Sequence, residues 1–226
     1  MKKMHLIMVF TLLFSGNLMA LTVESDHQPL KFDSTIDFNL SNIKNNYLVV
    51  VPEEIVYTTG PQKIKLEIAL SVLEEILNSE EFKTKILTYI RNSNAKNEFS
   101  RNYLWNNREM PLSNSEIYEL LISGDEKTVP NSLGEMNLNI QKYRSSWRKK
   151  NVIGYTNPRT SKWIHVNSRQ YDHIAVSKMV GNLTHEWIHL LGFLHGKNNI
   201  REEVPYVVGR IAGELAKEIL DKRYEQ

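Results

Sequence analysis

Residues 181–196 read GNLTHEWIHLLGFLHG, in which three histidines, one glutamate and one glycine follow the spacing H-E-x-x-H-x-x-G-x-x-H. These five positions are His185, Glu186, His189, Gly192 and His195. Residues four apart lie on the same face of a helix, about one turn distant, so the first two histidines would direct their imidazole nitrogens at one point. The stretch therefore predicts a helix with a polar site on an otherwise apolar segment.

The glycine and the third histidine predict how this helix ends. A helix commonly ends with a residue at positive φ, which glycine adopts at low cost, so we expect Gly192 to end the helix and turn the chain back. His195, three residues later, can then return to the first two histidines. Three imidazole nitrogens suit zinc, which binds them at about 2.0–2.1 Å, and they leave a fourth position open for water.

We therefore expect one catalytic zinc ion held by His185, His189 and His195, with Glu186 placed to accept a proton from a water at the metal. The alternative is a core helix in which the histidines are buried polar groups with hydrogen-bond partners. Burying three unpaired imidazoles among Leu, Ile, Trp and Phe is costly, which favours the metal site.

The motif resembles that of the metzincin clan of zinc endopeptidases. The preceding segments are similar to the clan's layout of a strand, a long helix and then strands leading into the active-site helix. The likeness extends over about residues 45–210, and residues 185–195 carry its specific part. It implies that the three histidines bind zinc, that Glu186 is the general base, and that residues 151–158 form an edge strand that receives substrate as an extra antiparallel strand.

The chain departs from the clan at the turn beneath the zinc. Metzincins have a methionine after the third histidine, whereas the last methionine here is Met179, before the motif. The corresponding position falls near residues 204–206, Val-Pro-Tyr. Tyr206 could pack its ring as the apolar floor of the site, which we favour, or its hydroxyl could stabilise the oxyanion that forms during attack on a carbonyl.

Hydrophobic periodicity predicts one mixed α+β domain. Strands are expected at residues 47–52, 135–143, 151–158 and 162–168, the first buried and the second with one buried and one wet face. Helices are expected from Pro61, after Ser79, from Ser113 to Gly124, over residues 175–191 and from near Pro205. The second of these helices is expected to carry the apolar residues Phe82, Ile86, Leu87 and Ile90. This order describes a small mixed twisted sheet with a long backing helix, an active-site helix after the sheet and a C-terminal helix.

The first twenty residues differ from the rest of the chain. A basic start, MKKMH, precedes the apolar run LIMVFTLLF and a short segment that ends at Ala20. This order is typical of a secretory signal peptide, and the run is shorter than the roughly 20 residues of a transmembrane helix. We predict a signal peptide at 1–20, an N-terminal extension or short pro-segment at 21–46 and a catalytic domain at 47–226, secreted or periplasmic in a bacterium. A buried N-terminal helix is the alternative.

Composition limits the partners. Without residues 1–20 the chain has 26 basic residues, which is 28 minus Lys2 and Lys3, and 26 acidic residues. A neutral chain offers no electrostatic surface for nucleic acid or an anionic membrane. The chain has no cysteine, so an exported domain depends on its core rather than on disulfides. We expect a monomer that takes a protein or peptide substrate and has no nucleic-acid partner and no stable membrane anchor.

Four other titratable residues are weaker candidates. His165, on an expected strand, is interpreted as structural, and His173 as a surface residue. Asp33 or Asp37 could cap the zinc in a latent form.

Three functions are consistent with the motif. The leading one is a secreted zinc endopeptidase. A second keeps the site and changes the bond, to peptide cross-links of a bacterial cell wall. The third is a zinc-holding binding or inhibitory module without turnover, and the intact Glu186 argues against it because such a module has no need of a base.

Overall fold

The computed structural model describes residues 10–14, 17–21, 47–56, 61–90, 99, 112–127, 132–147, 150–157, 159–195 and 201–224. The chain divides into two units, residues 1–39 and 40–226. In the first, β1 (Phe10–Phe14) and β2 (Asn17–Leu21) pair antiparallel. Both strands lie in or at the end of the predicted signal peptide, whose cleavage stays a prediction. None of the helices in the described ranges combines the length and the apolarity needed to cross a membrane.

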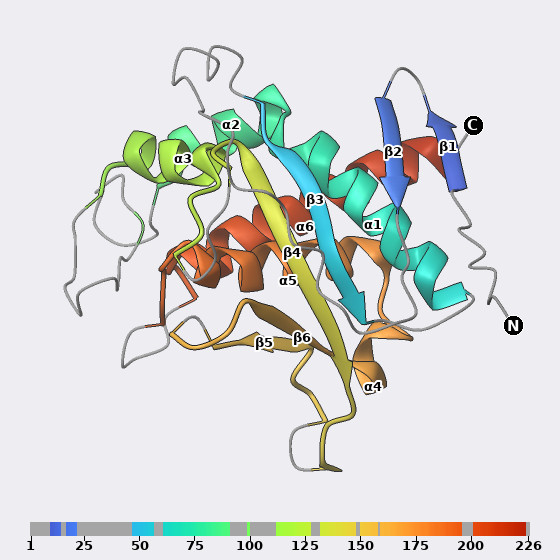
Figure 1. Ribbon diagram of the computed structural model, residues 1–226. Helices are drawn as coiled ribbons and strands as arrows, with labels where there is room; N and C mark the ends of the chain where they lie inside the picture. The colour runs from blue at the N-terminus through green and yellow to red at the C-terminus, as the bar shows by residue number, and fades with distance from the viewer. Residues whose placement is uncertain are drawn as a thin grey trace, which may run out of the picture. The chain divides into compact units, whose positions relative to one another are not determined.

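The second unit contains a four-stranded mixed sheet with helices against one face (Figure 1). Its strands are β3 (Val49–Val56), β4 (Glu135–Tyr143), β5 (Gly154–Thr156) and β6 (Trp163–Asn167), in the order β3-β4-β6-β5. β4 is parallel to both of its neighbours, whereas β5 pairs antiparallel with β6. This sheet confirms the α+β class. β5 lies at an edge, as expected for residues 151–158, although its ladder is only three residues long.

Five of the six described helices begin and end close to the predicted positions, whereas the short helix at residues 168–171 was not predicted. They are α1 (Pro61–Leu77), α2 (Glu80–Leu87), α3 (Asn114–Ser123), α4 (Ser168–Tyr171), α5 (Val176–Leu190) and α6 (Val204–Tyr224). Ser79 caps α2 by accepting a hydrogen bond from the Phe82 amide, and Ser113 forms the predicted capping box with Glu116. Gly124 ends α3 in the left-handed conformation, at φ 61°. These boundaries follow from local hydrogen bonding, which explains why the sequence predicted them.

The prediction of a wet face on β4 is wrong for its central residues. Asn137 and Asn139 are 4% and 1% exposed, so they are buried almost as completely as the apolar residues with which they alternate. Both side-chain amides donate to the Glu53 carboxylate on β3, at 3.2 Å for Asn137 and 2.7 Å for Asn139. These bonds satisfy the amide nitrogens, which lowers the cost of burial, whereas Oδ1 of each asparagine is buried without a hydrogen-bond partner among the described residues. The residue type alone does not reveal a partner such as Glu53.

Two further expectations need correction. The run at residues 47–52 belongs to an edge strand rather than to a fully buried one, because β3 pairs only with β4 among the strands that the structure describes, and Val49 is 43% exposed. Leu87 and Ile90, predicted on the apolar face of the second helix, are 37% and 58% exposed. Leu87 is the last residue of α2 and Ile90 lies beyond it, so neither continues the buried stripe.

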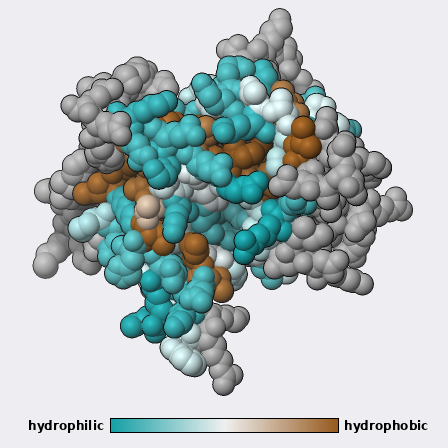
Figure 2. Space-filling view, turned by 180° about the vertical axis from the view of Figure 1, so that it is seen from behind, coloured by the Kyte–Doolittle hydropathy of each residue, from teal (hydrophilic) through white to brown (hydrophobic). Residues whose placement is uncertain are grey.

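The core lies between the sheet and the layer formed by α1, α5 and α6 (Figure 1). Seen from behind, the surface is mainly hydrophilic with hydrophobic patches between the polar groups (Figure 2). Helices α5 and α6 cross closely at Gly181 and Gly209, where a Cβ on either residue would lie 2.7 Å from the carbonyl oxygen of the other. A Cβ on Gly209 would also lie 3.0 Å from the Cβ of His185. Small residues therefore allow the start of α6 to approach the histidine-bearing face of α5.

Candidate metal centre

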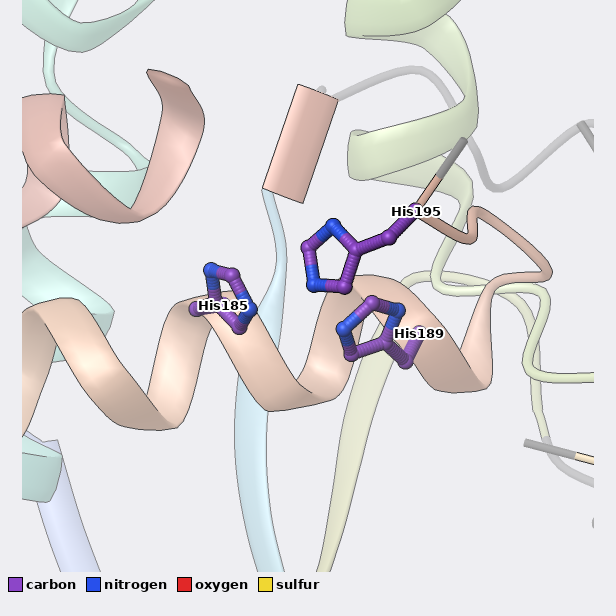
Figure 3. A group of neighbouring side chains, drawn as sticks. All are labelled: His185, His189 and His195. Atoms are coloured by element: carbon purple, nitrogen blue, oxygen red, sulfur yellow. The ribbon is translucent and has the colours of Figure 1, made fainter. Parts of the chain in front are cut away.

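Helix α5 and the turn after it bring the three histidines of the motif together (Figure 3). His185 and His189 project from adjacent turns of the helix, and His195 returns from the segment that follows it. One ring nitrogen from each lies within 4.8 Å of the others. The ring centroids are separated by 4.7–5.1 Å. The three histidines are therefore close enough to hold one metal ion.

Gly192 produces the turn that returns the chain. It has a φ of 102°, and its amide donates to the carbonyl of His189 at 3.0 Å. The next amide, of Phe193, donates to the carbonyl of Ile188 at 3.3 Å. This pair of bonds is a Schellman motif, which requires a positive φ at the glycine position. The turn directs the Phe193 carbonyl toward the Nδ1 atom of His189, at 2.6 Å.

Each histidine also has a partner outside the group of three. The Nδ1 atom of His189 contacts the Phe193 carbonyl, and that of His195 contacts Oε2 of Glu203 at 2.7 Å. His185 forms a hydrogen bond with the backbone of Pro205. An acceptor at Nδ1 fixes the proton there and leaves the lone pair on Nε2 for a metal. Metal-binding histidines commonly have such hydrogen-bond partners on the ring nitrogen that does not face the metal.

Sequence reasoning missed Glu203. An acidic residue eight positions after His195, directly before the helix that Pro205 opens, was its only signal. The contact depends on the course of the chain between the two residues, which local periodicity does not determine.

Burial keeps two of the histidines neutral. It lowers the pKa of His185 to about 3, and the nearby charges of His189 and His195 add to that effect. Burial likewise lowers the pKa of His189 to about 4, opposed by its bond to the Phe193 carbonyl. Neutral imidazole is the form that binds metals. His185 and His189 therefore offer metal-binding nitrogens at neutral pH without first having to lose protons.

Glu186 lies on the side of α5 that faces the edge strand β5. It is 4% exposed, and burial raises the pKa of its carboxyl to about 7, with hydrogen bonding from Thr156 and Asn182 acting in the opposite direction. The amide of Asn182 is 3.4 Å from Oε1 of Glu186. Gly154 allows β5 to lie close to the Asn182 side chain, because a Cβ at this position would lie 2.6 Å from Oδ1 of Asn182. A carboxyl that titrates near neutrality beside a group of histidines is suited to proton transfer.

Tyr206 packs against two of the histidines. Its ring stacks on His195, with centroids 4.6 Å apart and an interplanar angle of 29°, and meets His185 more edge-on at 4.8 Å. Tyr206 of the Val-Pro-Tyr segment therefore lies against these two histidines, as the resemblance to metzincins led us to expect. This contact agrees with the packing interpretation of Tyr206.

The other candidates are not part of this centre. His165 stacks on Tyr155 of β5, with centroids 4.6 Å apart, and His173 does not belong to the group of metal-competent side chains in the described ranges. Asp33 and Asp37 lie outside the described residues.

Comparison of the chain with models of protein families, with curated proteins and with solved structures gave no match. The likeness to metzincins therefore depends on the residues of this chain alone.

Proposed function

We propose that this protein is a zinc-dependent endopeptidase of the metzincin type, exported after cleavage near Ala20, that acts on protein or peptide substrates. The observation that carries the proposal is the convergence of three hydrogen-bonded histidines next to a buried glutamate at a sheet edge. Either feature alone is common in folded proteins. Together they supply a metal site, a base and a place for substrate.

The donor set fits zinc better than other common ions. Imidazole nitrogens suit zinc, whereas calcium and magnesium require oxygen ligands. Three protein ligands are the number that catalytic zinc sites provide. When bound, the ion would polarise the substrate carbonyl and lower the pKa of a water molecule toward 7.

The chain's own residues would manage the proton and the substrate. Glu186 would accept a proton from the attacking water on its carboxylate and return it to the nitrogen of the leaving amine. β5 has a partner only on its β6 side among the described strands, so its free edge could bind an extended peptide through main-chain hydrogen bonds. Tyr206 would hold the rings of His185 and His195 in place by packing its own ring against them.

The test is hydrolysis of casein and of peptidoglycan in parallel gels, with and without a chelator. We expect the full chain to clear casein, the chelator to abolish clearing, and zinc to restore it. Clearing of peptidoglycan alone would move the substrate to cell-wall peptides. A zinc-loaded, folded protein that clears neither gel contradicts the proposed hydrolytic function.

Export has its own measurement. Mass spectrometry of protein from the medium or periplasm should find Leu21 at or near the N-terminus. An exported protein that retains Met1–Ala20 would contradict the signal-peptide interpretation.

A further inference from the structure

Glu203 is the one acidic side chain in hydrogen-bond contact with a histidine of the site, among the contacts described for the three ligands. Its Oε2 atom is 2.7 Å from Nδ1 of His195. His189 and His185 are held by the carbonyls of Phe193 and Pro205, which are neutral. His195 is therefore the single ligand with a partner that can carry a full negative charge.

The backbone holds this carboxylate in place. Glu203 directly precedes α6, and its carbonyl accepts the helix-starting bond from the Val207 amide at 3.0 Å. The side chain is only 2% exposed, whereas that of His195 is 30% exposed. The glutamate is thus the more deeply buried partner, and its carboxylate gives the His195 ring a defined hydrogen-bond partner.

Burial of this carboxylate also requires compensation. Removing an ionised carboxylate from water costs several kcal/mol unless hydrogen bonds or an opposite charge offset the loss. A divalent ion bound by the three imidazoles would bring a charge of +2 into the same region. Glu203 and the ion would each lower the cost of burying the other, with the His195 ring between them.

We propose that Glu203 is a positioning residue that sets the metal affinity of the site, by orienting His195 through Nδ1 and by balancing the charge of the bound ion. The inference rests on the metal centre of the proposed function and not on hydrolysis. Outer carboxylates of this kind are typically worth about 10–100-fold in metal affinity.

The experiment measures zinc affinity of the full chain by competition with a chromophoric chelator. Glu203→Gln keeps an oxygen acceptor for Nδ1 and removes the charge, whereas Glu203→Leu removes both. Glu218→Gln, at an exposed position of α6, is the matched control. The melting temperature of each metal-free variant separates a loss of affinity from a loss of fold.

We expect Glu203→Gln to bind zinc about tenfold more weakly and Glu203→Leu about a hundredfold more weakly than wild type, with Glu218→Gln unchanged. Glu203→Gln should melt at the wild-type temperature without metal, so it remains decisive even if the leucine variant does not fold. Wild-type affinity in Glu203→Gln would overturn the inference and leave the proposed hydrolysis untouched. Conversely, a weakened Glu203→Gln in a protein that hydrolyses neither casein nor peptidoglycan would support this inference and refute the proposed function.

Discussion

Two buried glutamates lie on different sides of helix α5, and burial raises the pKa of both carboxyls to about 7. Glu186 belongs to the helix and faces β5, while Glu126 approaches it from the segment after α3. The two side chains are 4% and 3% exposed. Glu126 accepts hydrogen bonds from Nε1 of Trp187 at 2.6 Å and from the amide of Asn137 at 2.9 Å.

The difference between the two lies in their neighbours. Glu186 is next to the three histidines. Glu126 instead contacts the indole of Trp187 and the backbone amide of Asn137 on β4. That amide has no β6 partner, because β6 pairs with β4 only from Asn139 onward. Glu126 thus takes the place of a neighbouring strand and joins β4 to α5. A raised pKa reports burial in both cases, and only the surrounding groups indicate which carboxyl can do chemistry.

The largest difference between the surroundings of Glu186 and those of Glu126 is expected from a comparison of His189→Ala with Trp187→Phe. The first removes a ligand and should lose most of the zinc, since two imidazoles hold the ion far more weakly than three. The second deletes the indole donor and so removes one of the hydrogen bonds to Glu126, at a cost of about 1–3 kcal/mol in the free energy of unfolding, with zinc retained. Metal analysis and urea unfolding measure both. Stoichiometric zinc in His189→Ala would disprove the ligand assignment.

Exchange of the two carboxyls for amides is the next comparison. Glu186→Gln should keep the fold and the zinc but lose about 10²–10⁴-fold in hydrolysis, because an amide cannot accept the proton of water. Glu126→Gln should hydrolyse casein at close to the wild-type rate. Turnover at saturating substrate, with zinc content determined in the same samples, distinguishes the two. If Glu186→Gln also lost its metal, Glu186 would be a structural part of the site and the proposed role would be wrong.

The raised pKa of Glu126 predicts how the stability of the fold depends on pH. Its folded pKa of about 7 lies above the ordinary value of 4.5, so between these two pH values the folded state binds more protons than the unfolded state. Stability must then fall as pH rises through this window, by on the order of 3 kcal/mol for this group. Glu126→Gln cannot ionise and should lack that fall, being more stable than wild type above pH 7 and similar below 4.5. Parallel stability curves for the two proteins from pH 4 to 8 would contradict this account.

The smallest effect is expected at Tyr206. If its ring is a floor for the histidines, Tyr206→Phe keeps the packing and should lower turnover less than about tenfold, whereas loss of an oxyanion donor costs about 10²–10³-fold. Tyr206→Ala should instead destabilise the fold by about 2–3 kcal/mol, at or below the lower range for a large-to-small change because the ring is only half buried. A hundredfold fall in Tyr206→Phe with zinc intact would make Tyr206 a catalytic residue.

The sequence by itself predicted what depends on neighbours along the chain. The spacing of His185 and His189, the positive φ of Gly192 and the capping box at Ser113 each follow from bonds within one helix and its ends. The element order and the α+β class also followed, because periodicity changes between helices and strands. In each case the deciding groups lie within about one or two helical turns, where geometry is nearly fixed.

Only the tertiary structure showed which distant groups meet. The partner of His195 at Glu203, the burial of Asn137 and Asn139 under Glu53, and the contact of Glu126 with Trp187 all join separate elements. Residue type predicted the opposite for the two asparagines, because polar side chains are usually exposed. A hydrogen-bond partner such as Glu53 lowers the cost of burying a polar side chain, and the fold rather than the adjacent sequence brings that partner into contact.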